Sequence, residues 1–128
     1  MILLDSSALL AALQRESGGK QVETTLGLGK TAITTANLSE VLSVLATRAG
    51  VPVSETLHTL HQLPLKIVTV SQEIAVQSAE LLARWPKSGL SLGDCICLAT
   101  GLLKHWHILT ADTAWLKYKM GVEIQLIR

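Results

Sequence analysis

The chain has 128 residues, of which 48% are apolar, and its formal net charge is only +1. This length fits one globular domain spanning residues 1–128 and is too short for two domains of ordinary size. The near-neutral charge excludes a global basic field of the kind that marks nonspecific nucleic-acid binders. No apolar run approaches the roughly 18 residues that a membrane span needs.

The first residues do not resemble a secretory signal, because a short apolar run is followed at once by the carboxylate of Asp5. The two cysteines, Cys95 and Cys97, lie two positions apart in a helical pattern, where their side chains point about 200° apart and cannot pair with each other. We therefore expect reduced, packed thiols and a cytoplasmic protein.

Charge is distributed unevenly along the chain. Residues 1–83 carry five basic and seven acidic side chains, a net −2, whereas residues 84–128 carry six and three, a net +3. The second part is the better place for a surface that contacts phosphate, although exposed lysines more often only solvate a face. The candidates there are Arg84, Lys87, Lys104, Lys117 and Lys119.

Short apolar stretches alternate with longer segments of helical period. In chain order, strands are expected at residues 2–4, 31–34, 67–70, 107–109 and 122–127, and helices between them at 7–13, 21–26, 54–61 and 74–83. Two further helices have the clearest apolar stripes: Leu38, Val41, Leu42 and Leu45 in the first, and Leu92, Ile96, Ala99 and Leu103 in the second. The alternation predicts an α/β fold with helices on both faces of a mainly parallel, five-stranded sheet.

The three aspartates of the chain all fall at junctions between predicted elements. Asp5 follows the first strand, Asp112 follows the fourth strand, and Asp94 lies in the first turn of the helix that begins near Ser91. In a parallel α/β sheet, strand ends and helix starts of this kind share one edge, where ligand sites form. We therefore expect the three aspartates to lie close together.

Glu40 is expected to join them, because residues 33–37 lead out of the second strand into a helix with Glu40 in its opening turns. Four acids in one crevice oppose each other's ionisation unless a divalent cation that prefers hard oxygen ligands neutralises them. Helix N-termini favour anions, so the same region would also receive a phosphate. The pattern predicts a Mg²⁺ or Mn²⁺ site.

Each of these acids also has a purely structural interpretation. Asp is a preferred N-cap, and acids in the first helical turn complement the helix dipole. The pairs Ser91 with Asp94 and Asn37 with Glu40 have the spacing of capping boxes, and Asp5 could be a simple cap, as could Asp112. A cap explains any one acid well, but three of three aspartates at one predicted edge favour a shared site.

The aromatic residues leave two interpretations open. They could stack on bases, or they could anchor the core or an interface, and the absence of phenylalanine from the chain favours the second. These residues are Trp85, Trp106, Trp115 and Tyr118.

Each of the four acids lies in a short motif of its own. The motifs run in order between residues 1 and 122. They are Leu3-Leu4-Asp5-Ser6-Ser7-Ala8-Leu9, Asn37-Leu38-Ser39-Glu40-Val41, Leu90-Ser91-Leu92-Gly93-Asp94 and Leu109-Thr110-Ala111-Asp112. Together the motifs resemble the PIN-domain family and, within it, VapC-type toxins, and the combination is far more specific than any single motif.

The resemblance implies a three-layer α/β/α fold, Mg²⁺-dependent or Mn²⁺-dependent endoribonuclease activity, homodimerisation, and neutralisation by a cognate antitoxin. Some relatives carry another acid after the last aspartate, where this chain has Ala114 and Trp115, so the number of metal ions stays open. The catalytic and metal-binding acids would be Asp5, Glu40, Asp94 and Asp112, with Ser6 and Thr110 as supporting polar residues.

Two alternative functions remain. A phosphoryl-transfer protein would use Asp5 as its nucleophile, but haloacid-dehalogenase-like phosphatases want a second aspartate at the position of Ser7, and receiver domains place their phosphoacceptor after a mid-chain strand. The non-enzymatic alternative is a catalytically silent PIN-like module that only binds a partner. The presence of all four acids argues against that module.

Overall fold

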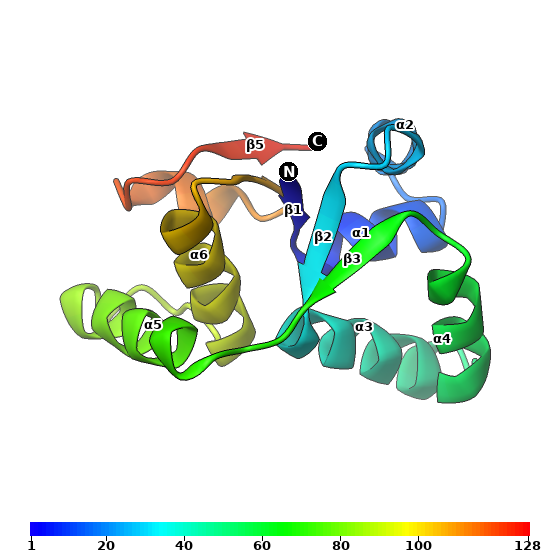
Figure 1. Cartoon of the computed structure of the whole chain (residues 1–128), viewed down its shortest axis with the longest axis horizontal. Helices are drawn as coiled ribbons and strands as arrows, with labels where there is room; N and C mark the ends of the chain where they lie inside the picture. Colours follow the sequence, from blue (N-terminus) through cyan, green and yellow to red (C-terminus); the bar gives the residue numbers. More distant parts are fainter.

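Five short strands form one sheet at the centre of the computed structural model, which describes residues 1–128 (Figure 1). The strand order is β3-β2-β1-β4-β5, and every neighbouring pair is parallel. The strands are β1 (Ile2–Leu4), β2 (Thr31–Thr34), β3 (Leu65–Val68), β4 (His107–Thr110) and β5 (Ile124–Leu126). The sheet expected from the sequence is confirmed and is parallel throughout.

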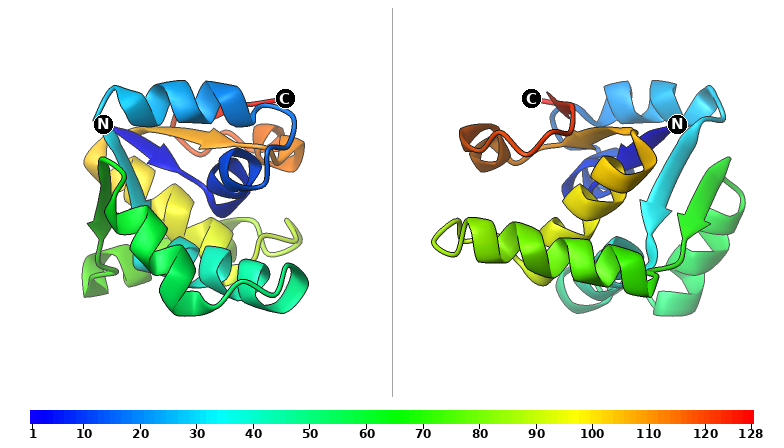
Figure 2. Two further views of the ribbon diagram at one scale, coloured as in Figure 1. Left: turned by 90° about the vertical axis from the view of Figure 1, so that its right-hand side faces the viewer. Right: turned by 60° about the vertical axis from the view of Figure 1, so that its left-hand side comes forward.

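Helices cover both faces of this sheet (Figures 1 and 2). One face carries α1 (Ser6–Leu13), α2 (Gly19–Gly27), α3 (Thr35–Arg48) and α4 (Val53–His61). The other carries α5 (Gln72–Arg84), α6 (Leu92–Lys104) and the short 3₁₀ helix η1 (Thr113–Lys117). The three-layer α/β/α arrangement is therefore confirmed, and none of the helices combines the length and apolar character of a membrane-spanning segment.

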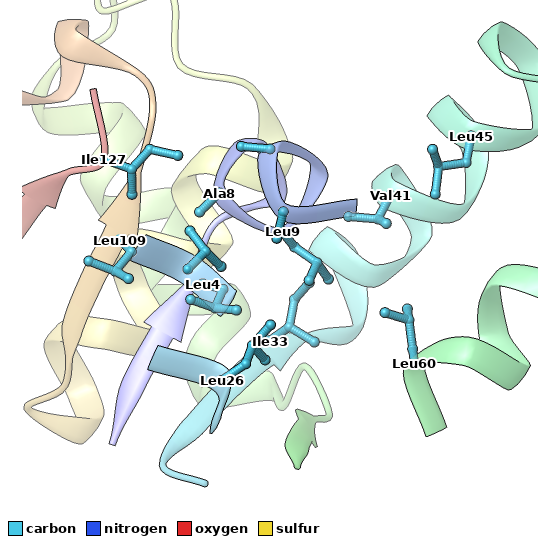
Figure 3. Packing of buried hydrophobic residues seen from close by; sticks show 13 residues of the cluster. Leu4, Ala8, Leu9, Leu26, Ile33, Val41, Leu45, Leu60, Leu109 and Ile127 are labelled. Carbon is cyan, nitrogen blue, oxygen red and sulfur yellow. The ribbon is translucent and has the colours of Figure 1, made fainter. Parts of the chain in front are cut away.

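The core is divided into two clusters because successive strand residues point to opposite faces. Leu3 and Ile108 pack with α5 and α6, whereas their neighbours Leu4 and Leu109 pack with α1 and its companions. Figure 3 shows the second cluster, in which the side chains of Leu4 and Leu9 lie close together. Burying one such leucine stabilises the fold by about 1.5–3 kcal/mol. Because both faces of the sheet bury leucines in this way, both helical layers are held against the sheet.

The third strand lies two residues earlier than the predicted range 67–70. Its register against β2 pairs Leu65 with Thr31 and Val68 with Thr34. Val70 is not part of the sheet, since its backbone N–H donates to Thr35 Oγ1 at 3.3 Å. The pairing with β2, which local hydrophobicity does not reveal, therefore decides where this strand begins and ends.

Two predicted helix starts have different outcomes. Ser91 and Asp94 form a capping box at the start of α6, as their spacing indicated. The predicted N-cap at Asn37 is wrong, because α3 begins earlier and its N-cap is Thr34, whose side chain accepts a hydrogen bond from the Asn37 backbone N–H. The side chain of Asn37 is thereby released for other contacts.

The two cysteines are free and buried in α6, as expected for packed thiols. Burial raises the pKa of Cys95, and burial raises the pKa of Cys97 well above its ordinary value. Both side chains therefore stay protonated at neutral pH and serve the packing of the helix.

Candidate active site

A cavity of about 300 Å³ opens at the carboxyl edge of the sheet, and all four predicted acids line it. They come from four separate places in the fold. Asp5 follows β1, Glu40 lies in the second turn of α3, Asp94 lies in the first turn of α6, and Asp112 is the N-cap of η1 after β4. The structure thus brings together the residues that the sequence placed at one edge.

Asp5 is the deepest of the four acids, with only 4% of its surface exposed. Its Oδ2 accepts hydrogen bonds from Ser7 Oγ at 2.7 Å and from Thr110 Oγ1 at 2.9 Å. Its Oδ1 has a single long contact, 3.5 Å from Asn37 Nδ2. Although Asp5 stands at the N-cap position of α1, its side chain makes no capping hydrogen bond, so the cap interpretation does not account for it.

Thr110, predicted as a supporting residue, orients two acids at once. Besides donating to Asp5, its Oγ1 accepts a hydrogen bond from the Asp112 backbone N–H at 3.0 Å. Ser7, which the sequence analysis missed, binds Asp5 and also accepts from the Ala111 backbone N–H at 2.9 Å. Ser7 could have been recognised from the sequence, because it stands two residues after an aspartate that was expected to be part of the site. These hydroxyls hold Asp5 and the start of the Asp112 segment together.

Asn37 is a second residue that the sequence analysis missed as part of the site. Its side chain is completely buried, and its Nδ2 donates to Ser6 Oγ at 3.0 Å and to the Gly93 carbonyl at 3.4 Å. Its Oδ1 accepts from Thr34 Oγ1. The side chain of Ser6, predicted as a supporting residue, therefore bonds to Asn37, and the backbone hydrogen bond of Ser6 is one of those that lower the pKa of Asp5. The amide links α1, α3 and the start of α6.

The remaining two aspartates combine a cap with a place in the cavity. Asp94 Oδ2 accepts from the Ser91 backbone N–H at 2.9 Å, and Asp112 Oδ1 accepts from the Ala114 backbone N–H at 2.9 Å. In each carboxylate the other oxygen makes no hydrogen bond within the chain, and both residues line the cavity. The structural and functional interpretations therefore apply to the same residues.

None of the four acids in this cavity forms a salt bridge with a basic side chain. The salt bridges of the chain join Arg128 to Glu16 and His107 to Glu123, and neither includes one of the four acids. Unpaired, converging carboxylates with limited exposure are typical of functional sites.

The pKa values of two carboxyl groups respond to this crowding. Burial raises the pKa of Asp5 to about 6, and the charge of Asp94 adds to the rise, while the bonds from Ser7 and Thr110 oppose it. Burial also raises the pKa of Asp94, with the charges of Asp112 and Glu40 contributing.

The donor set suits a hard, partly hydrated cation. No three carboxylates approach closely enough to enclose an ion by themselves. Each of the four nevertheless retains an oxygen without a close hydrogen bond in the chain, and the cavity has room for water. Mg²⁺ keeps several of its waters and binds through one or two carboxylates, so the residues present fit it, or Mn²⁺, through oxygen ligands.

A parallel sheet between two helical layers, with an acidic cavity at the carboxyl ends of its strands, defines an α/β/α protein whose ligand site lies at that edge. The family model of the PIN domain matches residues 2–120. The chain belongs to the PIN domain family.

Solved structures of similar fold come from several bacteria. A toxin-antitoxin complex from Klebsiella pneumoniae is 23% identical with a TM-score of 0.76, and the match covers 100% of this chain and 98% of that one. DNA-bound VapBC from Salmonella typhimurium is 11% identical with a TM-score of 0.77, covering 99% and 98%. VapC20 of Mycobacterium tuberculosis, a toxin that cleaves the sarcin-ricin loop, is 18% identical with a TM-score of 0.73, covering 96% and 99%. No curated protein matches the sequence significantly.

Proposed function

We propose that this protein is a Mg²⁺-dependent or Mn²⁺-dependent endoribonuclease that hydrolyses RNA phosphodiester bonds and acts as the toxin of a toxin-antitoxin pair. The observation that carries the proposal is the meeting of four carboxylates around one cavity, none of them in a salt bridge with a basic side chain. They come from the end of β1, from α3, from α6 and from the N-cap of η1. Membership of the PIN domain family supports it.

Each acid has a proposed role that follows from its surroundings. Asp5 and Asp94 would be the principal ligands of the cation, directly or through water, because the hydroxyls and the capping box hold them in place. Asp112 would bind the cation or position a water. Glu40 is exposed and makes no hydrogen bond in the chain, so it is free to act as a ligand or to accept a proton from the attacking water.

When bound, the divalent cation would supply positive charge that activates water and offsets the charge developing on the phosphodiester. The chain's own contribution is to orient these oxygens before the substrate arrives, since the hydroxyls of Ser7 and Thr110 leave Asp5 Oδ2 little freedom to rotate. The backbone N–H groups at the start of α6 favour an anion at the same edge of the sheet.

RNA is the proposed substrate class, supported by the similarity to a toxin that cleaves the sarcin-ricin loop. We further propose a cognate antitoxin protein as partner, because the similar structures include toxin-antitoxin complexes. The protein would work in the cytoplasm as a homodimer. Light scattering of the purified chain measures the oligomeric state, and copurification with a tagged candidate antitoxin measures the partnership.

The decisive experiment incubates purified protein with RNA in the presence of Mg²⁺ or Mn²⁺. We expect cleavage that EDTA stops and that Asp94→Asn abolishes while the circular dichroism spectrum is retained. Glu73→Gln is the matched control, because Glu73 is also an acid in the first turn of a helix but lies outside the cavity. Cleavage that resists chelation would contradict the proposal.

Two other results would favour the alternatives. Covalent labelling of Asp5 by a phosphoryl donor would indicate an aspartate-based phosphoryl-transfer protein. Metal-independent RNA binding without any cleavage would indicate a binding module.

A further inference from the structure

The cavity of the four acids is only partly acidic, because α3 contributes a line of three different side chains to it. Glu40, Val44 and Arg48 all line the cavity and follow one another at intervals of four residues. Residues at this spacing lie above one another on one face of a helix. The line therefore leads from an acid, past an apolar side chain, to a base at the last residue of α3.

Helix α1 forms the opposite wall, and its side chains also change from polar to apolar and back to polar along the cavity. Leu10 and Gln14, again four residues apart, line the cavity after the polar residues at the start of the helix. The cavity is thus a groove between α1 and α3, acidic at the sheet edge, apolar in the middle and polar at the outer end. Eight residues of α-helix separate Glu40 from Arg48, a rise of about 12 Å.

Arg48 is exposed and makes no hydrogen bond or ion pair in the chain. Arg128, the other arginine of the groove, is engaged with Glu16 Oε2 at 3.3 Å and with the Ser17 carbonyl at 3.0 Å. Glu40 and Glu16 line the same cavity as Arg48, yet neither pairs with it. Arg48 is therefore the cation of the groove with all its donors available.

The groove adjoins a second cavity at Glu16. A neighbouring cavity of about 590 Å³, lined by the loop between α1 and α2, shares Glu16 with it and contains no hydrophobic residue. Arg15 and Lys20 lie in that second cavity. Glu16 and Glu23 line it as well, so its two bases are matched by two acids and its lining is polar with no net charge.

We propose that a single strand of RNA lies along the groove between α1 and α3, with one phosphate at the acids and another phosphate bound by Arg48. The inference rests on the proposed function and names how its substrate is held. The guanidinium of Arg48 would bind phosphate oxygens through paired N–H donors, and Leu10 and Val44 would contact the sugar or base between the two phosphates. Arg48 is then a positioning residue, which strengthens the binding of the RNA and fixes which phosphate lies at the acids.

The test compares Arg48→Gln with Arg84→Gln on a short single-stranded RNA. Arg84 is the control because it too is the exposed, basic last residue of its helix. Although the sequence made it a candidate for phosphate contact, its guanidinium lies 4.5 Å from the centre of the Trp85 ring and outside the groove, so this proposal gives it no phosphate. For Arg48→Gln we expect KM to rise about tenfold with kcat within about twofold, since the lost contact is a charged hydrogen bond away from the acids. The slope of log KM against log salt concentration should become shallower by about 0.7, the value for one phosphate contact on a single strand.

Arg48→Lys keeps the charge without the paired donors, so it should retain the salt slope and recover part of the KM. Arg84→Gln should behave as wild type in both measurements. Equal effects of Arg48→Gln and Arg84→Gln would overturn the proposal, because they would show only a lost charge at a helix end. Unchanged KM and slope in Arg48→Gln, with wild type active, would overturn it while leaving the nuclease function intact.

A wild-type protein that cleaves no RNA would end the proposed function but still allow a test of the groove. Fluorescence anisotropy of a labelled single-stranded RNA then measures binding alone. Weaker binding with a shallower salt slope in Arg48→Gln, absent in Arg84→Gln, would support the groove as an RNA site. No binding by wild type would overturn both proposals.

Discussion

Thr110 and Asp5 stand 105 positions apart in the sequence, and the Thr110 hydroxyl donates a hydrogen bond to Asp5 Oδ2 at 2.9 Å. The contact joins the ends of two adjacent parallel strands, β1 and β4. It orients the most buried acid of the cavity and lowers the pKa of Asp5, against the effect of burial. The geometry of the acidic edge therefore depends on a neutral side chain.

Thr110→Val removes this hydroxyl while keeping the shape of the side chain. We expect about 1 kcal/mol less stability and about tenfold lower RNA cleavage at neutral pH, because Asp5 loses a fixed partner and its pKa rises further. Thr100→Val is the control, since Thr100 is equally buried but bonds only to the Ile96 carbonyl within α6. Denaturant melts and initial cleavage rates measure the two effects. Equal activity of the two variants would show that the hydroxyl contact is unimportant.

The raised pKa of Asp5 makes the metal-free protein less stable as pH rises. Between the ordinary pKa of 3.8 and the folded value of about 6, the native state binds more protons than the unfolded state, so stability falls with increasing pH across this window. Asp5→Asn cannot ionise and should escape this loss. The stability of Asp5→Asn relative to wild type should therefore increase by about 2 kcal/mol between pH 4 and pH 7.5 in EDTA. A pH-independent difference in urea melts would refute the buried, ionisable Asp5.

A divalent cation should reverse that penalty by binding the ionised carboxylates. At a Mg²⁺ or Mn²⁺ concentration 100 times the dissociation constant, we expect the wild-type free energy of unfolding to increase by about 2.7 kcal/mol. Asp94→Asn should gain much less, whereas Glu73→Gln should gain as much as wild type. Thermal melts with and without EDTA provide the measurement. If neither cation changes the Tm of the wild-type protein, the proposed metal site is contradicted.

Gly19 permits the close crossing of α1 and α2. A Cβ at this position would lie 2.4 Å from the Ala11 carbonyl oxygen, a backbone atom that cannot turn aside. Gly19→Ala should therefore cost about 2 kcal/mol or more. Gly27→Ala, at the other end of the same helix, meets nothing within 4 Å and should be neutral or slightly stabilising. Denaturant midpoints distinguish the two, and equal midpoints would contradict the close packing.

The strands and the four acids could be predicted because their signals are local. A buried parallel strand is a short apolar run, and an acid at a strand end or helix start can be recognised from a few neighbouring residues. The predicted bounds of β1 and β2 agree with the structure. The third strand was predicted two residues too late in the chain, since its limits depend on its pairing with β2 and not on its own residues.

Asn37 and Arg48 could not be recognised in the same way. The role of Asn37 depends on the Gly93 carbonyl, 56 positions away, and on the buried Ser6 hydroxyl. Arg48 looks like an ordinary base at a helix end until the groove between α1 and α3 is formed. The contacts of Asn37 and the proposed role of Arg48 both depend on which distant segments lie beside the side chain, and a local pattern does not contain that information.

The amino-acid sequence by itself determined the alternation of strands and helices and the placement of Asp5, Glu40, Asp94 and Asp112 at the ends of elements, because hydrophobic period and turn residues act over short distances. Only the tertiary structure decided which carboxylate oxygens stay free and how deeply Asp5 is buried. These properties come from contacts between segments far apart in the chain, and desolvation and charge repulsion depend on those contacts.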